Sequence, residues 1–346
     1  MTLTNRDLSE LLARRADEAG NDHRALAYRR AARAALTWPE EAAALAAAGR
    51  ALTELAGVGP RIAARIAAWL DDPPEVPEPP PTRRGFMTLA EARAELADDP
   101  TWRAELKGDL QMHTVGSDGR HTIEELARRA VELGHSYIAL TDHTQGIKVA
   151  GGMDEAAFEA QAHELASIRA RLRAEGLSIE ILHGAEMNLD GDGRGDMDPA
   201  FMRRLDLVLG SFHTGLRAGG DQTKRYVAAL MNPSIHVLAH PGTRRWNRRL
   251  SLEADWDVVF AAAAHTGVAL EIDCTAERQD LEPDLLADAA RAGCTFSIGT
   301  DAHYLFELDS IDIGLASAKR AGLERAQILN YLGADALRRW ANEHRA

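Results

Sequence analysis

The fold of this chain is decided by short stretches of one form, represented by YIALTDH at residues 137–143. Its first four residues form an apolar run typical of a buried strand. Asp142 and His143, at the end of the stretch, can both bind a metal ion. Working outward, six further β-prone runs occur, at residues 109–113, 179–188, 205–212, 236–240, 268–273 and 295–300. Seven such runs predict parallel strands that close like a barrel.

Stretches of helical length separate these runs. They lie at residues 123–133, 154–174, 224–231, 255–266, 283–292 and 313–321, and a closing helix is expected at 334–343. Strands that alternate with helices in this way are typical of βα units, so we expect an α/β fold.

The residues before the first strand have a different character. Residues 7–70 are Ala-rich with a helical pattern, and residues 71–82 contain six prolines, which forbid helix. A further helix is expected at about 88–106. We therefore predict three parts: a small all-α domain at 1–70, a Pro-rich linker with a connecting helix at 71–107, and the barrel at 108–346.

Composition limits the functional classes. With 346 residues, 45% of them hydrophobic, the chain can bury a barrel core and a small extra module. Residues 1–70 carry a net charge of +2 and the remainder −15. Any nucleic-acid-binding surface is therefore expected in residues 1–70. The two cysteines fit a reducing compartment, and neither a signal peptide nor a membrane span of roughly 20 apolar residues is found. We expect a cytoplasmic protein.

Nearly every predicted strand ends in, or is followed at once by, a residue that can bind a metal ion. These residues are Gln111, His113, Asp142, His143, Glu186, His213, His240, Asp301 and His303. Because the carboxyl ends of barrel strands share one face, their side chains are expected to converge on a site for more than one ion. His183 and His236 lie earlier in their strands, and we interpret them either as structural or as support for the ligands without contact to an ion.

The expected chemistry of this cluster depends on which other catalytic motifs the sequence contains. The chain has no Gly-x-Ser-x-Gly motif, reactive cysteine motif or Gly-rich phosphate loop, so metal-bound water is the expected nucleophile and phosphate esters are the expected substrates. Lys148, Arg217 and Arg244 follow strand ends and are candidates to bind phosphate oxygens. Solvated surface charge is an equally good interpretation of Arg217.

An acidic stretch at residues 190–198, DGDGRGDMD, resembles a calcium loop because Asp and Gly alternate in it. It lacks the closing glutamate of such loops. We interpret it as a solvated turn after the third strand.

Taken together, the strand-end motifs resemble those of the polymerase-and-histidinol-phosphatase (PHP) superfamily. They are GDLQMHT at 108–114 with SDG at 117–119, TDH at 141–143, GAE at 184–186, SFH at 211–213, AHP at 239–241 and TDAH at 300–303. The likeness is greatest to the C-terminal PHP domain of bacterial X-family DNA polymerases. It implies a distorted seven-stranded TIM-like barrel with 3′–5′ exonuclease activity.

The resemblance also implies ligand sets for two to three ions, Mn²⁺ or Zn²⁺. By it, one ion is held by Gln111, His113, Glu186 and Asp301, a second by Glu186, His213 and His240, and a third by Asp118, His143 and His303. Glu186 would bridge two ions. We expect Glu186, His213 and Asp301 to act in catalysis, with Lys148 and Arg244 on the phosphate.

Two positions depart from the family pattern. Gln111 stands where the first motif has histidine, and a neutral amide oxygen weakens ion binding there and favours harder metals such as Mn²⁺. Asp273, in the sequence EID at 271–273, stands where asparagine is common, which leaves the role of that motif open.

The front segment LTELAGVGPRIAARI at 52–66 resembles a helix-hairpin-helix of the same polymerases. Gly57 and Gly59 let the backbone approach a DNA phosphate at a helix start, and Arg61 is a candidate DNA contact. A helical protein-contact module is the alternative. Between this segment and the barrel there are only about forty residues, too few for a polymerase palm, so we do not expect a polymerase.

These patterns leave three hypotheses. The leading one is a metal-dependent DNA phosphoesterase, a 3′–5′ exonuclease or 3′-end phosphatase in DNA repair, whose N-terminal domain grips DNA. The second is a small-molecule phosphatase acting on a phosphate ester such as histidinol phosphate. The third is a non-catalytic DNA-binding scaffold. A membrane partner is not expected, and the oligomeric state stays open.

Overall fold

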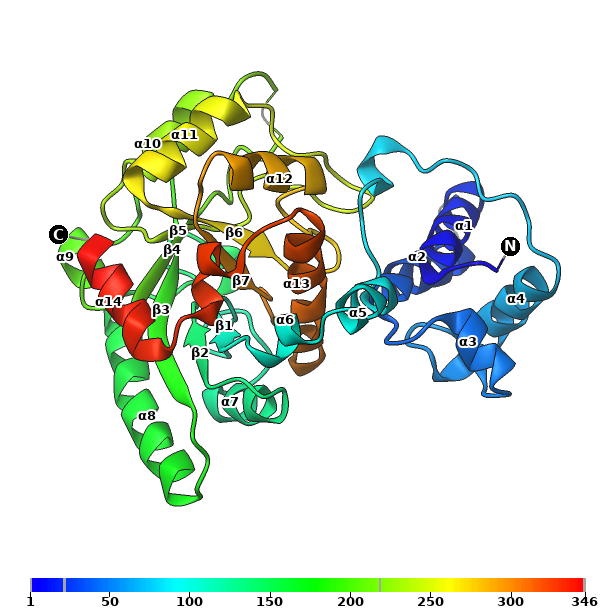
Figure 1. The fold of residues 1–346 in the computed structure, drawn as a ribbon, viewed down its shortest axis with the longest axis horizontal. Helices are drawn as coiled ribbons and strands as arrows, with labels where there is room; N and C mark the ends of the chain where they lie inside the picture. The colour runs from blue at the N-terminus through cyan, green and yellow to red at the C-terminus, as the bar shows by residue number, and fades with distance from the viewer. Residues whose placement is uncertain (1, 21–22, 218, 345–346) are drawn as a thin grey trace.

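Figure 1 shows a computed structural model of the chain, which describes residues 2–20, 23–217 and 219–344. Seven parallel strands form a sheet in the order β1-β2-β3-β4-β5-β6-β7. The strands are β1 (Gly108–Asp109), β2 (Tyr137–Leu140), β3 (Glu180–Asn188), β4 (Leu207–Ser211), β5 (Val237–Leu238), β6 (Ala269–Asp273) and β7 (Phe296–Gly299). The seven-stranded α/β architecture predicted from the sequence is confirmed.

The sheet curls into a nearly closed barrel. Past the end of β1, Met112 pairs in parallel with Ala302, and the N–H of His113 donates to the Ala302 carbonyl at 2.9 Å. These contacts join the first strand to the segment after β7, so the residues that follow the strands meet at one mouth.

Helices cover the outside of the barrel (Figure 1). They are α7 (Ile123–Glu132), α8 (Glu155–Ala174), α9 (Pro199–Met202), α10 (Thr223–Leu230), α11 (Trp256–Thr266), α12 (Pro283–Arg291), α13 (Ile311–Arg320) and α14 (Ala334–His344). Side chains of β2 alternate between two cores: Ile138 and Leu140 pack outward with residues of α7 and α8, whereas Tyr137 and Ala139 point into the barrel. Leu337 of α14 joins the inner core and closes the end opposite the mouth.

The N-terminal region is helical, as predicted. It contains α1 (Asn5–Glu18), α2 (His23–Ala34), α3 (Ala42–Ala47) and α4 (Pro60–Asp71). Between α3 and α4 the chain turns at Gly57, whose φ of +75° lies in the left-handed region, and a Cβ there would lie 3.1 Å from the Ala34 Cβ. A glycine is therefore needed for the hairpin to pack on α2.

Three predicted elements differ from the structure. The helix expected at 88–106 is divided into α5 (Leu89–Ala97) and α6 (Thr101–Ala104), because Pro100 cannot supply a helical N–H. The strand expected at 109–113 contributes only Asp109, as the end of β1, and the strand expected at 236–240 contributes only the two residues of β5. Beyond those residues the chain leaves the sheet to place side chains at the mouth. Among the described residues, no helix is long and apolar enough to cross a membrane.

Candidate metal centre

Histidine and carboxylate side chains converge at the mouth of the barrel. Three groups each offer ligand atoms that lie within 4.8 Å of one another, which is close enough to hold a metal ion. The groups are His113, Asp118, His143 and His303; His143, Glu186 and His213; and His113, Glu186 and Asp301. These groups bring seven of the predicted residues together, in a combination suited to several divalent ions. Gln111, Asp142 and His240 are not among the seven, and Asp142 instead accepts the Thr114 N–H at 2.8 Å.

Glu186 of β3 lies at the centre of this cluster. One of its oxygens, Oε1, lies 3.0 Å from His240 Nε2 and 3.3 Å from His213 Nε2. The other, Oε2, lies 3.1 Å from His143 Nδ1 and 3.3 Å from His113 Nε2. A fully buried carboxylate that faces four imidazoles through both oxygens has the arrangement of a bridging ligand, the role predicted for it.

The backbone is strained at two of the predicted ligands. His240 has a φ of 31° and Asp301 a φ of 50°, both in a region that residues other than glycine rarely adopt. Surrounding hydrogen bonds hold them there: the His240 N–H donates to Glu271 Oε2 at 2.8 Å, and the Asp301 N–H donates to the Gln111 carbonyl at 3.0 Å. Strain that neighbouring groups impose in this way is typical of functional sites.

The polar atoms left over fit metal ions. Within the described part of the chain, four buried atoms of the cluster make no hydrogen bond: the Nδ1 atoms of His113, His143 and His240, and Oδ1 of Asp118. Two of them make ion-pair contacts instead, His143 Nδ1 with Glu186 at 3.1 Å and Asp118 Oδ1 with His303 at 3.2 Å. Burying such atoms without a hydrogen bond is costly, and a coordinated cation removes that cost.

Charge in the cluster supports the same interpretation. Burial acts to lower the pKa of His113, but hydrogen bonds to Asp301 and Glu186 raise it well above the usual histidine value. Burial acts to raise the pKa of Glu186, but the charges of His143 and His213 hold it well below the usual value. Glu186 is therefore ionised, and protons on the surrounding imidazoles neutralise its charge. Divalent cations can replace those protons and neutralise the carboxylates in the same place.

Gln111 is placed beside the cluster, but its amide already has a partner. The residue is fully buried, and in the orientation that satisfies its hydrogen bonds the amide nitrogen donates to Glu271 Oε2 at 2.7 Å. Asp273 stands two residues further on, with one oxygen accepting the Thr275 N–H at 2.6 Å. The motif at 271–273 therefore supports Gln111 and the loop after β6.

Arg278 is a residue of the mouth that sequence reasoning missed. Its Nη2 lies 3.3 Å from Asp301 Oδ2, its Nε lies 3.7 Å from Asp273 Oδ2, and a quarter of its side chain is exposed. It follows β6 by five residues, but no motif marks it. Only its position after a strand end could have drawn attention to it.

The cations predicted to bind phosphate are placed differently. Lys148 is exposed on a short 3₁₀ helix after β2, and Arg217 is exposed after β4. Arg244 is almost fully buried: its guanidinium stacks 3.8 Å from the Phe86 ring centroid and pairs with Glu282 at 3.3 Å. These contacts favour a structural role for Arg244, and a phosphate role for any of the three stays a prediction.

His183 and the acidic loop at residues 190–198 both make hydrogen bonds to other parts of the barrel. His183 Nε2 lies 3.1 Å from Gln161 Oε1, and the same glutamine donates to Asp142 at 2.6 Å. In the loop at 190–198, the carboxylate of Asp196 accepts the Thr144 hydroxyl at 2.7 Å, as expected of a turn. No metal-binding group in the described chain includes that loop.

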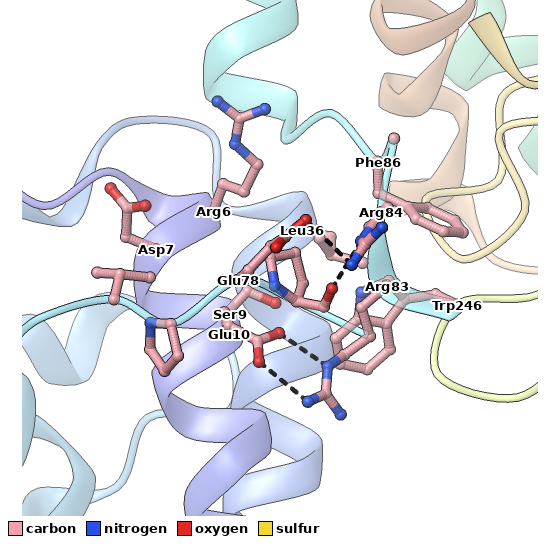
Figure 2. Close-up of a pocket in the computed structure, with 14 residues that line it drawn as sticks. Arg6, Asp7, Ser9, Glu10, Leu36, Glu78, Arg83, Arg84, Phe86 and Trp246 are labelled. Carbon is pink, nitrogen blue, oxygen red and sulfur yellow. Dashed lines mark hydrogen bonds and ion pairs between the residues drawn. The ribbon is translucent and has the colours of Figure 1, made fainter. Parts of the chain in front are cut away.

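A separate hollow of about 400 Å³ lies between the N-terminal helices and the segment at residues 76–86, with Trp246 of the barrel at its wall (Figure 2). Charged side chains on its wall pair with each other: Arg83 with Glu10 at 2.8 Å, and Arg84 with Glu78 at 3.0 Å. The hollow is thus part of the contact between N-terminal region and barrel, distinct from the metal centre.

A barrel with such a cluster at its mouth defines a metal-dependent phosphoesterase. The chain matches a PHP domain over residues 109–275 and a helix-hairpin-helix domain over residues 3–72. A probable phosphatase of Syntrophotalea carbinolica is 30% identical over 244 residues, which cover 66% of this chain and 93% of that protein. The chain belongs to the PHP family, with a helix-hairpin-helix domain at its front.

Other relatives differ in extent. The DNA polymerase/3′-5′ exonuclease PolX of Bacillus subtilis is 35% identical over 227 residues, which cover 65% of this chain but only 39% of that protein. The chain thus spans less than half of that relative. A histidinol phosphate phosphatase of Lactococcus lactis, solved with zinc, L-histidinol and phosphate, superimposes with a TM-score of 0.48 and 18% identity, over 63% of this chain and 94% of that one.

Proposed function

We propose that this protein is a DNA phosphoesterase that acts on 3′ ends, as a 3′–5′ exonuclease or a 3′-end phosphatase in DNA repair. The observation that carries the proposal is the packing of the N-terminal region against the loops that bear the metal centre. Arg33 of α2 pairs with Glu277 at 2.9 Å, and the next residue, Arg278, reaches the centre. In the loop after β5, the Asn247 N–H donates to the Thr82 carbonyl at 2.7 Å. DNA bound to the N-terminal domain would therefore lie beside the mouth of the barrel.

Positive charge gathers on one side of the mouth, where it favours a polyanion. Arg249 follows β5 and is half-buried, with its Nε donating to the Thr243 carbonyl at 2.7 Å. Burial lowers the pKa of Arg249, and so do the nearby charges of Arg278, Arg245 and Arg217. Cations from the loops after β4, β5 and β6 thus lie near one another, as a phosphate backbone requires.

The hairpin before α4 is the proposed DNA-binding element. Gly57 makes the turn, Gly59 caps the helix, and Pro60 occupies its first position. The first turn of α4 then offers backbone N–H groups, with Arg61 exposed beside them. These groups suit a phosphate of the DNA backbone without reading its sequence.

We assign different chemical roles to the ions and residues of the metal centre. Divalent ions, for which we propose Mn²⁺ or Zn²⁺ in two to three sites, supply Lewis acidity and lower the pKa of a water molecule when bound. Glu186 holds four imidazoles in register through its two oxygens. Arg278 orients Asp301 and places a fixed cation where a phosphoryl oxygen would bind.

The comparison with the Bacillus subtilis protein supports the DNA assignment, because that relative is a DNA polymerase/3′-5′ exonuclease. A polymerase activity is not proposed, since only 36 residues separate α4 from β1. A small-molecule phosphatase is the second candidate. It is favoured by the probable phosphatase of Syntrophotalea carbinolica, which aligns over 93% of its length.

The test is turnover by the full-length protein with Mn²⁺ on three substrates: a 3′-recessed duplex, a 3′-phosphorylated duplex and histidinol phosphate. We expect a higher kcat/KM on one of the DNA ends than on histidinol phosphate. The reverse order would establish the small-molecule candidate instead.

Two variants complete this experiment. Glu186→Gln removes the bridging charge and should abolish turnover, whereas Glu159→Gln changes an exposed carboxylate of α8 that pairs with Arg204 and should not. Turnover of no substrate above the Glu186→Gln background would leave only a non-catalytic scaffold.

A further inference from the structure

Two aromatic side chains stand exposed at the mouth, directly after a predicted metal ligand. Tyr304 and Phe306 follow His303 on the segment after β7, and 41% of Tyr304 and 62% of Phe306 are exposed. Their rings are stacked, with centroids 5.5 Å apart and planes inclined by 27°. Large aromatic side chains are seldom left exposed in pairs without a binding role.

The pair is fixed rigidly to the metal centre. One oxygen of Glu307 accepts the N–H groups of His303 at 2.7 Å and of Tyr304 at 3.0 Å. His303 in turn places its Nε2 3.2 Å from Asp118 Oδ1. The aromatic rings thus have a defined position relative to the residues that hold the ions.

The neighbouring loop, which follows β1, extends this surface. The Arg120 N–H donates to the His303 carbonyl at 2.9 Å, so the two loops lie side by side. That loop exposes Val115, at 59%, and the Arg120 side chain, which has no ion pair among the described residues. An apolar surface, a cation and a metal centre therefore adjoin one another.

We propose that Tyr304 and Phe306 form a stacking platform for the base of the nucleotide at the DNA 3′ end. The proposal rests on the DNA function proposed above and deepens it. A phosphate at the metal centre carries its nucleoside within reach of the adjoining rings, and Arg120 suits a further backbone phosphate. Every base has an aromatic face, so such a platform binds ends of any sequence. Two rings and a valine are far smaller than the roughly 800 Å² per partner of a stable protein interface.

The experiment compares two oligonucleotides that differ only at the 3′-terminal residue, one with a normal nucleotide and one with an abasic tetrahydrofuran. The full-length protein with Mn²⁺ is assayed beside the double variant Tyr304→Ala/Phe306→Ala. We expect the double variant to raise KM for the normal end by roughly 10-fold, with kcat retained and the abasic end unaffected. The double variant Tyr304→Phe/Phe306→Tyr, which keeps both rings, should behave as wild type.

Other outcomes overturn the platform in distinguishable ways. Equal losses on both oligonucleotides, or no loss on either, would overturn it while the DNA function stands. If wild type processes neither oligonucleotide but hydrolyses histidinol phosphate, the DNA function itself fails. Bound metal per chain, measured for each variant, should equal that of wild type. A wild-type dimer that the alanine variant converts to monomer, by sedimentation, would assign the rings to self-association and overturn the proposal.

Discussion

At the scale of the residue, Gln111 is the uncharged member of a set of predicted ligands that otherwise carry imidazole or carboxylate groups. Its side chain is fully buried, and its amide nitrogen is engaged by Glu271. The neutral oxygen left to an ion is a weaker ligand for zinc than an imidazole nitrogen.

We predict that Gln111→His increases the affinity of the weakest zinc site by roughly 10-fold or more. The imidazole supplies a nitrogen ligand next to His113 and Asp301. Titration of zinc against a competing chelator measures the effect. Gln327→His, which adds an imidazole beside the start of β7 at the other end of the barrel, is the control. Equal affinity in Gln111→His and wild type would mean that residue 111 does not contact an ion.

The ligand candidates could be predicted from the sequence because each follows a recognisable strand. Arg278 could not, because its partner Asp301 follows the neighbouring strand β7 and lies beside it only once β6 and β7 have paired. The contact between Gln111 and Glu271 joins the ends of β1 and β6, which are far apart in the strand order and meet only when the barrel curls closed, so no local pattern encodes it.

At the scale of the element, apolar runs predicted where the strands lie but not how many residues of each strand pair with a neighbouring strand. β1 and β5 keep only two paired residues each, because the chain beyond them bends toward the centre. His240, two residues after β5, has a left-handed backbone that a strand pattern cannot anticipate. Strand ends are thus least predictable where they serve the site.

The end of α7 supplies a test of pH-dependent stability. His135, just after α7, is 4% exposed, and neither ring nitrogen has a hydrogen-bond partner in the described chain. Burial, helped by the Arg103 cation, lowers the pKa of His135 from 6.5 to about 3. The neutral ring is therefore favoured in the folded state. Its stabilising contribution is present above pH 6.5 and is lost as the pH falls toward about 3.

We predict that His135→Leu removes this loss. Between about pH 7 and about pH 4, the free energy of unfolding of His135→Leu should fall less than that of wild type. Urea unfolding at the two pH values measures the difference. The exposed His163→Leu on α8 is the control and should track wild type. If the gap between His135→Leu and wild type is the same at both pH values, His135 does not titrate as described.

At the scale of the whole molecule, the Pro-rich segment is more than a linker. Arg83 at its end donates to both oxygens of Glu10 on α1, at 2.8 and 3.0 Å (Figure 2). It also donates to Asn247 of the barrel at 2.8 Å. Prolines predicted the break in helix correctly. They could not predict this contact, because its partners are 73 and 164 residues away in the sequence.

We predict that Arg83→Met lowers the free energy of unfolding by about 3 kcal/mol, because among the described residues the buried Glu10 carboxylate then keeps only the more distant Arg14, at 3.7 Å, as an ion-pair partner. Arg50→Met, which breaks pairs with Glu40 and Glu54, should cost much less, because solvent screens those exposed pairs. Chemical denaturation of both variants measures these costs. Adding Glu10→Leu to Arg83→Met should restore stability in part. Equal costs for the two arginine variants would show that Arg83 does not hold the N-terminal region to the barrel.

The central claim is that Glu186 organises a centre of several divalent ions, and the most direct test is the number of ions bound. After dialysis against Mn²⁺, metal analysis of wild type should give two to three ions per chain. Glu186→Gln, shown to be folded by its unchanged circular dichroism, should lose at least one of them. An unchanged count in Glu186→Gln, or fewer than two ions in wild type, would contradict the account.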